Sequence, residues 1–247
     1  MFPHWLEAEL FAWCVRGNVT LPSSIGVFSF GRKQSQRCPN KMLRPFAGTT
    51  LADIVLEKLR TFAPRAFFAA YDEEFREKSE RHGVPFVARD ARSVAIDEPI
   101  TEILSFLRAV PYTHLLIVNG CLPFLRTTTI AGFLEDCVRG ELAPAFAVTR
   151  RQNHFISMDR RPLNFPIDLK TINTKTVEPV LEFAHALYFF DKSYFFQHGG
   201  YWDWRTVRLI ETGHPHETVD IDTEEDFGFA EALWKAGLAP SEERVSG

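Results

Sequence analysis

The sequence predicts an α/β domain in which helices flank a mostly parallel sheet. Apolar segments of strand length alternate along the chain with longer segments whose apolar residues recur at helical spacing. Strands that alternate with helices are typical of a parallel sheet that is covered on both faces. The chain has 247 residues, of which 45% are hydrophobic, so one large domain has enough apolar material for its own core.

The first predicted unit is a strand, a long loop and a helix. The strand covers residues 25–30, and a loop rich in cations follows it to about residue 47. Thr50 is the candidate N-cap of the helix, with Asp53 at the third helical position. An apolar stripe at helical spacing follows, which predicts that the helix packs one face on the sheet.

The alternation of strands and helices continues to the end of the chain. We expect further strands at 66–70, 114–118, 145–149, 184–190 and 219–221. We expect further helices at 73–82, 102–110 and 129–139. A last helix should begin with a capping box formed by Thr223 and Asp226.

The chain divides into an N-terminal extension and linker (1–24), one domain (25–240) and a short tail (241–247). Residues 2–16 have apolar positions at helical spacing, which predicts a short amphipathic helix in the extension. Within the domain, the polar segment at about 150–180 contains several prolines and shows no regular period. We expect this segment to form an arm, a lid or a dimer contact.

Charge and composition exclude several classes of protein. The net charge is −4 and the pI about 6.1, so nothing indicates a nucleic acid or an anionic membrane as a partner. No apolar run reaches the roughly 18 residues of a membrane span, and the N-terminus lacks the basic start of a secretory signal. The four cysteines form no C-x-x-C pair, which predicts reduced thiols in a cytoplasmic protein.

The loop at 31–44, which we call the basic loop, is the first candidate site. Its cations are Arg32, Lys33, Arg37, Lys41 and Arg44, and no acidic residue occurs between positions 10 and 52. Because the loop follows the first strand, it should lie where open α/β sheets bind ligands. Arg and Lys side chains there suit a polyphosphate. The loop contains neither G-x-x-x-x-G-K-[ST] nor G-x-G-x-x-G, and the alternative interpretation is a solvated surface loop.

Two carboxylates near the C-terminus, Asp220 and Asp222, form the second candidate site. On a strand, residues two apart share a face, so both carboxylates would reach one cation. Mg²⁺ usually takes one or two carboxylates together with waters and phosphate oxygens. The acids at 224–226 are interpreted instead as the first turn of the last helix. D-x-D alone is a weak pattern, and the alternative is an acidic loop.

Two segments together resemble a known family. Residues 30–41 read Phe-Gly-Arg-Lys-Gln-Ser-Gln-Arg-Cys-Pro-Asn-Lys, and residues 219–227 read Val-Asp-Ile-Asp-Thr-Glu-Glu-Asp-Phe. The first resembles the pattern P-A-R-x-G-S-K-R-x-P-x-K-N of the acylneuraminate cytidylyltransferases, and the second resembles their I-D-I-D-T-x-E-D-F/L. That family includes CMP-sialic acid synthetases, and CMP-Kdo synthetases are close relatives. The likeness covers most of residues 25–233.

The resemblance implies a three-layer α/β/α fold of the nucleotide-diphospho-sugar transferase type (GT-A, Rossmann-like). It implies a cytidylyltransferase that transfers CMP from CTP to an acidic sugar such as a nonulosonic acid, with release of pyrophosphate. The reaction would depend on Mg²⁺ and would serve nucleotide-sugar supply for cell-surface polysaccharides. A homodimer is also implied, with the arm as candidate contact.

The resemblance further implies a role for each site residue. The residues that would contact the phosphates are Arg32 and Lys41. Further contacts to the nucleotide would come from Gly31, Ser35, Arg37 and Asn119. The Mg²⁺ ligands would be Asp220 and Asp222. No general base is nominated, and the aromatic residues at 201–204 suit either stacking on a base or sugar or burial in a core or dimer interface.

The chain departs from the family at several positions of the site. Met42 replaces the usual Asn, and Asn119 replaces the usual Gln. Cys121 replaces the Thr of sialic-type members and the metal-binding Asp of the Kdo branch, which argues against Kdo-type metal binding. In the arm, Asn173 and Lys175 replace Arg and Gln. Three alternatives stay open: nucleotidyl transfer with CTP or GTP to a different sugar, sugar phosphate or phosphonate, a GT-A glycosyltransferase, and a catalytically impaired nucleotide-binding homologue.

Overall fold

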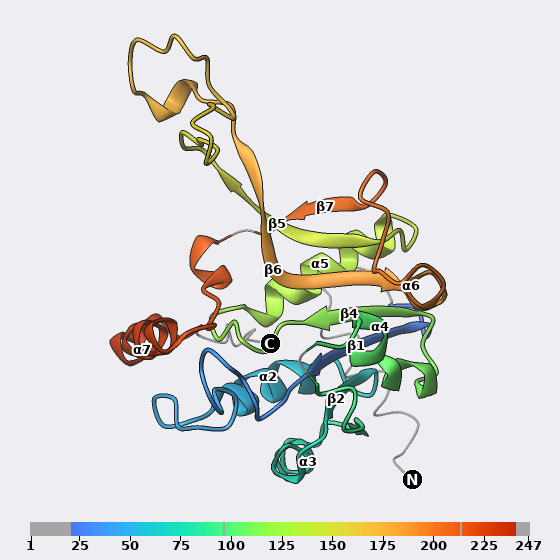
Figure 1. The fold of residues 1–247 in the computed structure, drawn as a ribbon. Helices are drawn as coiled ribbons and strands as arrows, with labels where there is room; N and C mark the ends of the chain where they lie inside the picture. The colour runs from blue at the N-terminus through green and yellow to red at the C-terminus, as the bar shows by residue number, and fades with distance from the viewer. Residues whose placement is uncertain (1–20, 96, 213, 241–247) are drawn as a thin grey trace, which may run out of the picture.

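The computed structural model describes residues 21–95, 97–212 and 214–240, and these form one seven-stranded mixed sheet (Figure 1). The strands lie in the order β3-β2-β1-β4-β6-β5-β7. Their bounds are β1 Ile25–Phe30, β2 Ala66–Ala70, β3 Phe86–Ala88, β4 His114–Val118, β5 Ala145–Arg151, β6 Val180–Asp191 and β7 Arg208–Glu211. Strand β6 runs antiparallel to β4 and β5, whereas the other pairings are parallel. The predicted mostly parallel sheet is confirmed.

Helices connect most of these strands, and both of the predicted N-caps are present. The α-helices are α2 Leu51–Arg60, α3 Glu73–Arg81, α4 Ile100–Ile103, α5 Thr127–Arg139, α6 Lys192–His198 and α7 Glu224–Leu233. Shorter turns are the 3₁₀ helices η1 Ser105–Ala109, η2 Thr174–Thr176 and η3 Pro215–Thr218, and the π-helical turn η4 Trp234–Leu238. Thr50 accepts the Asp53 N–H at the start of α2. Thr223 and Asp226 form the reciprocal capping box at the start of α7.

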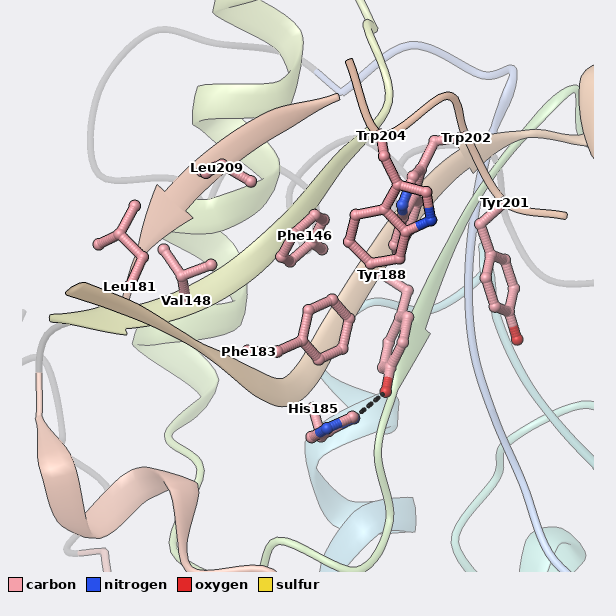
Figure 2. Close-up of a pocket in the computed structure, with 10 residues that line it drawn as sticks. All are labelled: Phe146, Val148, Leu181, Phe183, His185, Tyr188, Tyr201, Trp202, Trp204 and Leu209. Atoms are coloured by element: carbon pink, nitrogen blue, oxygen red, sulfur yellow. Dashed lines mark hydrogen bonds between the residues drawn. The ribbon is translucent and has the colours of Figure 1, made fainter. Parts of the chain in front are cut away.

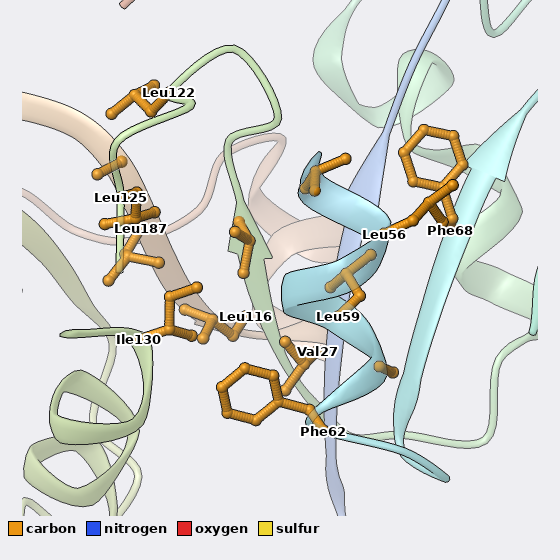
Figure 3. Packing of buried hydrophobic residues seen from close by; sticks show 14 of the residues in the cluster. Val27, Leu56, Leu59, Phe62, Phe68, Leu116, Leu122, Leu125, Ile130 and Leu187 are labelled. Atoms are coloured by element: carbon orange, nitrogen blue, oxygen red, sulfur yellow. The ribbon is translucent and has the colours of Figure 1, made fainter. Parts of the chain in front are cut away.

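Alternate side chains of β1 point into two separate apolar clusters, one on each face of the sheet. Val27 belongs to the larger cluster, to which α2, α5 and α7 contribute. Figure 3 shows α2, with Leu56 and Leu59, packed over this face of the sheet. Phe28 belongs to the second cluster, which α6 and the segment 100–110 cover. Because both faces are covered, the predicted three-layer arrangement is confirmed.

An arm extends from the sheet between β5 and β6, as predicted (Figure 1). It spans residues 152–179, of which only the short turn η2 is helical. Five of its apolar side chains are exposed: Ile156, Met158, Leu163, Ile167 and Ile172. Exposed apolar side chains that are grouped on one projecting segment are typical of an interaction surface.

Several predicted elements differ from the structure. The helix expected at 102–110 is divided into α4 and η1, because Leu104 between them lacks helical backbone angles (φ −107°, ψ 22°). The prediction of a strand at 219–221 is wrong. The segment is extended, but its ladder is reduced to one hydrogen bond, from the Ile221 N–H to the Cys121 carbonyl (3.1 Å). Elements β3, α6 and β7 were not predicted.

The structure describes residues 21–24 of the N-terminal extension and linker and none of the tail. The helix predicted at 2–16 lies outside the described residues, as do positions 241–247. Leu21, in the predicted linker, is 4% exposed and belongs to the larger apolar cluster. The last part of the linker therefore packs against the domain.

Candidate nucleotide site

A cavity of about 630 Å³ opens at the carboxyl ends of the adjacent parallel strands β1 and β4. Its walls come from the basic loop, from the turn at 119–121 and from Asp222. The sequence-predicted residues that line it are Gly31, Arg32, Ser35, Arg37, Lys41, Asn119 and Asp222. Of the predicted site residues, Asp220 alone does not line it. Segments almost 200 residues apart in the chain thus meet where an open α/β sheet binds ligands.

The basic loop begins at a glycine because the sheet leaves no space for a side chain there. A Cβ atom on Gly31 would lie 3.1 Å from the rings of Phe68 and Phe75. The Gly31 N–H continues the β1–β2 ladder by donating to Ala69. The loop then turns over the ends of the strands, and Asn40 adopts a left-handed conformation with φ of 57°. These constraints set the path of the backbone at both ends of the segment 31–40.

Not all cations of the basic loop reach the cavity. Lys33 pairs with Glu74 at the start of α3. Arg44 donates two hydrogen bonds to Glu224 (2.9 and 2.8 Å) and stacks on the ring of Phe227. Both cations therefore tie the loop to neighbouring helices. Arg32, Arg37 and Lys41 remain as the cations of this loop that line the cavity.

Lys41 joins the basic loop to the acidic segment 220–222. Its side chain is 12% exposed, and its Nζ donates to the Ile221 carbonyl and lies 3.2 Å from Asp222 Oδ1. Burial opposes the charge of Lys41, but the neighbouring Cys121 and Asp222 more than offset burial, so its pKa lies above the ordinary value. Asp222 also pairs with Arg37 at 2.8 Å. One carboxylate therefore faces two cations at the cavity.

Asp220 differs from Asp222 in its surroundings. One of its oxygens, Oδ2, accepts a hydrogen bond from the Asn119 amide at 3.4 Å. The other, Oδ1, is buried and has no hydrogen-bond partner among the described residues. Burial, and next the charge of Asp222, raise the pKa of Asp220 above its ordinary value. A bound cation would give this buried carboxylate oxygen a partner and would offset the repulsion between the two carboxylates.

The donor set available for a metal is small. Within 21–95, 97–212 and 214–240, no group of three or more His, Cys, Asp or Glu side chains is placed to hold an ion. The pair Asp220 and Asp222 fits Mg²⁺, because this ion needs only one or two protein carboxylates when phosphate oxygens and waters complete its shell. Burial raises the pKa of Cys121 to about 11, so the thiol next to the pair is neutral at pH 7.

The turn after β4 is held by the amide of Asn119. Its Oδ1 accepts the Cys121 N–H at 2.9 Å, and its Nδ2 donates to the His185 carbonyl at 2.9 Å as well as to Asp220. His185 lies on β6 with a positive φ of 52°. Asn119 thus connects the cavity to β6 and to the acidic segment.

Several residues that line the cavity were not predicted as site residues, and two of them, Arg89 and Ser29, are polar and buried. Arg89 directly follows β3 and is 5% exposed, and it donates to the carbonyls of Gly31 (3.2 Å) and Ile103 (3.1 Å). Burial, and next the charge of Arg32, lower the pKa of Arg89 to about 10. Ser29, on β1, presents a buried hydroxyl that lacks a hydrogen-bond partner in the same part of the chain. The signal for Arg89 was its place directly after an apolar run, but that run is only three residues long.

A second, aromatic cleft of about 460 Å³ adjoins the first cavity (Figure 2). It is lined by Phe146, Val148, Leu181, Phe183, His185, Tyr188, Tyr201, Trp202, Trp204 and Leu209. Tyr188 and Tyr201 line both spaces. Trp202 is buried, whereas Trp204 is 70% exposed. The aromatic segment 201–204 therefore contributes both to the core and to an open surface.

Comparison with known proteins places these features in a family context. The sequence-family model described as the MobA-like NTP transferase domain matches residues 31–211 of this chain. No curated protein matches the chain. None of the helices in the described residues is long and apolar enough to cross a membrane.

Solved structures share the fold at low sequence identity. A CMP:2-keto-3-deoxy-manno-octonic acid synthetase complexed with CTP has a TM-score of 0.63 and 13% identity, over 87% of this chain and 100% of that one. A cytidylyltransferase from Leptospira borgpetersenii has a TM-score of 0.57 and 13% identity, over 91% and 99%. A 4-diphosphocytidyl-2C-methyl-D-erythritol synthase from Anaerococcus prevotii has a TM-score of 0.52 and 14% identity, over 86% and 100%.

Proposed function

We propose the function from the family: the chain belongs to the MobA-like NTP transferase domain family. In this proposal, the nucleotidyltransferase transfers CMP from CTP to an acidic sugar and releases pyrophosphate. The observation that carries the proposal is the meeting of Arg32, Arg37, Lys41 and Asp222 around one cavity at the ends of β1 and β4. Cations on one side and carboxylates on the other suit a triphosphate that carries a divalent ion.

Cytosine is the base that the comparisons favour. The three structural relatives are named as cytidylyltransferases or as synthases of cytidine-nucleotide conjugates, and one of them is complexed with CTP. In this chain, one part of the cavity is lined by Ile100, Ile103 and the buried cation Arg89. Flat apolar walls with a guanidinium suit a planar base that has a carbonyl oxygen.

The phosphates would lie over the basic loop. Arg32 and Lys41 would contact them, with Gly31, Ser35 and Arg37 in support, and Asn119 would contact the nucleotide. Asp220 and Asp222 would hold Mg²⁺, which when bound offsets negative charge on the phosphate oxygens. Because Lys41 and Arg37 now pair with Asp222, they would exchange this carboxylate for phosphate when the nucleotide enters.

The reaction would be an in-line displacement at the α-phosphorus. The acceptor hydroxyl oxygen forms a bond to that phosphorus, the bond to the bridging oxygen breaks, and pyrophosphate leaves with that oxygen. The hydroxyl proton passes to solvent or to a base that we do not assign. Positioning of the two substrates and stabilisation of charge by Arg32 and Lys41 would provide most of the acceleration.

The aromatic cleft is our candidate site for the acceptor. Tyr188 and Tyr201 form its boundary with the nucleotide cavity, so an acceptor on them would face the phosphates. Rings of the cleft pack on one another, such as Phe146 and Trp202 with centroids 5.0 Å apart. Aromatic faces suit the C–H face of a sugar ring. We propose a nonulosonic acid as the acceptor, as the likeness to acylneuraminate cytidylyltransferases implies.

We also propose a homodimer that forms through the arm. The exposed apolar side chains of the arm, among them Ile167 and Ile172, would lose contact with water in such a pair. Analytical ultracentrifugation of the whole protein and of a variant with Ile167 and Ile172 replaced by Ser tests this. A parental protein that sediments as a monomer at tens of micromolar would contradict the proposal.

The main test is a pyrophosphate-release screen of the four NTPs against acidic sugars, sugar phosphates and phosphonates, with and without Mg²⁺. We expect release with CTP, an acidic sugar and Mg²⁺ together. Arg32→Ala and Asp222→Asn should abolish most of it, whereas Arg139→Ala, on the exposed surface of α5, should not. If the first two variants release pyrophosphate at the parental rate, the site assignment is wrong. Calorimetric binding of CTP without turnover on any acceptor would favour the non-catalytic homologue.

A further inference from the structure

Two ionisable side chains are buried next to the site but do not line it. Lys58, on α2, is 9% exposed, and Glu217, on η3, is fully buried. The Lys58 ammonium donates to the carbonyls of Leu122 and Pro123, both at 2.9 Å. Glu217 Oε2 accepts the backbone N–H of Arg126 at 3.0 Å. Both buried groups thus contact the turn at 119–126, which connects β4 to α5.

These two groups are costly to bury. Burial lowers the pKa of Lys58 to about 7, and the negative charge of Glu217 acts in the opposite direction. Glu217 Oε1 has no hydrogen-bond partner among the described residues. An ion that leaves water loses its hydration, and neighbouring groups must offset that loss. The compensation here comes from the 119–126 turn, whose backbone groups hydrogen-bond to both side chains. The Arg126 guanidinium adds an ion pair, with Nε 3.8 Å from Glu217 Oε1. The position of the turn and the position of the charges therefore depend on each other.

The same turn also holds the acidic segment. The Ile221 N–H donates to the Cys121 carbonyl at 3.1 Å, and Asn119 donates to Asp220 at 3.4 Å. Glu217 belongs to the chain just before this segment, so it fastens the segment to the turn at a third point. The turn therefore lies between Lys58 on one side and residues 217–222 on the other.

The basic loop is connected to the same assembly through α2. The loop ends at the start of this helix, where the Ala52 N–H donates to the Met42 carbonyl at 2.9 Å. Lys58 lies on the same helix and holds the turn from that side. A series of contacts therefore connects Lys41 to Asp222 through α2, Lys58, the turn and Glu217. This connection is additional to the direct ion pair between Lys41 and Asp222 at the cavity.

We propose that Lys58 and Glu217 form a buried clamp on the 119–126 turn that sets the position of Asp220 and Asp222 relative to the basic loop. Both are positioning residues, because neither lines the cavity and both act through the backbone of the turn. The inference rests on the proposed function for its effect on catalysis. The structural role of the two residues in holding the turn does not depend on which reaction the protein catalyses.

The first test is hydrogen–deuterium exchange of the whole protein. Glu217→Gln keeps the shape of the side chain and removes its charge, and Lys58→Met removes the ammonium. We expect faster exchange in peptides that cover 119–126 and 217–223, with β1 and β2 unchanged. The matched control is Glu135→Gln, which removes a buried acid of α5 that pairs with Arg139 instead. Parental exchange in both peptides of Glu217→Gln overturns the clamp, as does a uniform increase over the whole chain.

The second test measures Mg²⁺ activation of pyrophosphate release in Glu217→Gln. Loss of a group that orients metal ligands typically weakens metal binding by roughly 10- to 100-fold. We therefore expect the Mg²⁺ concentration for half-maximal release to rise about tenfold while the KM for CTP at saturating Mg²⁺ stays within about twofold. An unchanged Mg²⁺ requirement overturns the positioning role. If the parental protein releases no pyrophosphate, the proposed function fails, and the exchange experiment still decides the clamp.

Discussion

Replacement of Lys41 by Met tests the charge of the site most directly. Lys41 is 12% exposed, so an intermediate dielectric applies to it. Two unit charges about 4 Å apart then interact by roughly 4 kcal/mol at an effective dielectric constant of 20. Asp222, at 3.2 Å, offsets part of this attraction for phosphate. We therefore expect a loss of about 2–3 kcal/mol of transition-state stabilisation, which is roughly a 30- to 150-fold fall in kcat/KM.

The assay is pyrophosphate release, with kcat/KM for CTP measured at saturating acceptor and Mg²⁺. The matched control is Lys33→Met in the same loop, because Lys33 pairs with Glu74, is 41% exposed and does not line the cavity. This control should keep parental kinetics. The reasoning is refuted if Lys41→Met stays within threefold of the parental kcat/KM, or if Lys33→Met falls as far. Melting temperatures of both variants establish that each is folded.

Three further predictions concern the cleft, the packing of β1 and the alkaline limit of stability. Trp204→Ala removes an exposed wall of the aromatic cleft. This variant should raise the KM for the acceptor several-fold without changing the KM for CTP. Equal changes in both KM values would contradict the placement of the acceptor. Gly26→Ala puts a methyl group into the ring of Tyr112 and should cost about 1–3 kcal/mol, seen as a lower urea midpoint; an unchanged midpoint would contradict it. Burial raises the pKa of Cys137 from 9.0 to about 12, so above pH 9 the unfolded chain releases this proton first and stability falls with rising pH. In Cys137→Ala the fall between pH 9 and 11 should be less steep by up to about 1.4 kcal/mol per pH unit, measured by urea unfolding, and an identical slope would show that the thiol does not contribute.

Elements with a long, clear period could be predicted, and short ones could not. The apolar stripe and cap of α2 and the apolar run of β1 determine those elements locally, and both occur as predicted. Strands β3 and β7 have three and four residues, which is too short for any alternation to appear. The antiparallel direction of β6 depends on the arm that reverses the chain, and no local pattern encodes it. The segment 219–221 has strand-like residues, but pairing with a neighbour decides whether a strand forms.

The site could be predicted as a meeting of two segments but not in its details. The absence of acids near the basic loop indicated an anion site, and the loop does line a cavity with Asp222. Which cations are available depends on distant partners: Glu74 pairs with Lys33, and Glu224 pairs with Arg44. These pairings arise from the tertiary structure, so spacing along the chain does not reveal them. Arg89 was missed because the strand before it, β3, has only three residues.

The distance along the chain between Lys41 and Asp222 has a consequence during translation. The two residues are 181 positions apart, so at typical synthesis speeds the cations leave the ribosome on the order of 10 to 40 seconds before the carboxylates. Through that interval the nascent chain displays an anion-attracting turn without its acidic counterpart. A product truncated before residue 215 would remain in this condition permanently, able to attract polyanions but without the pair of acids that would select a metal-bound one.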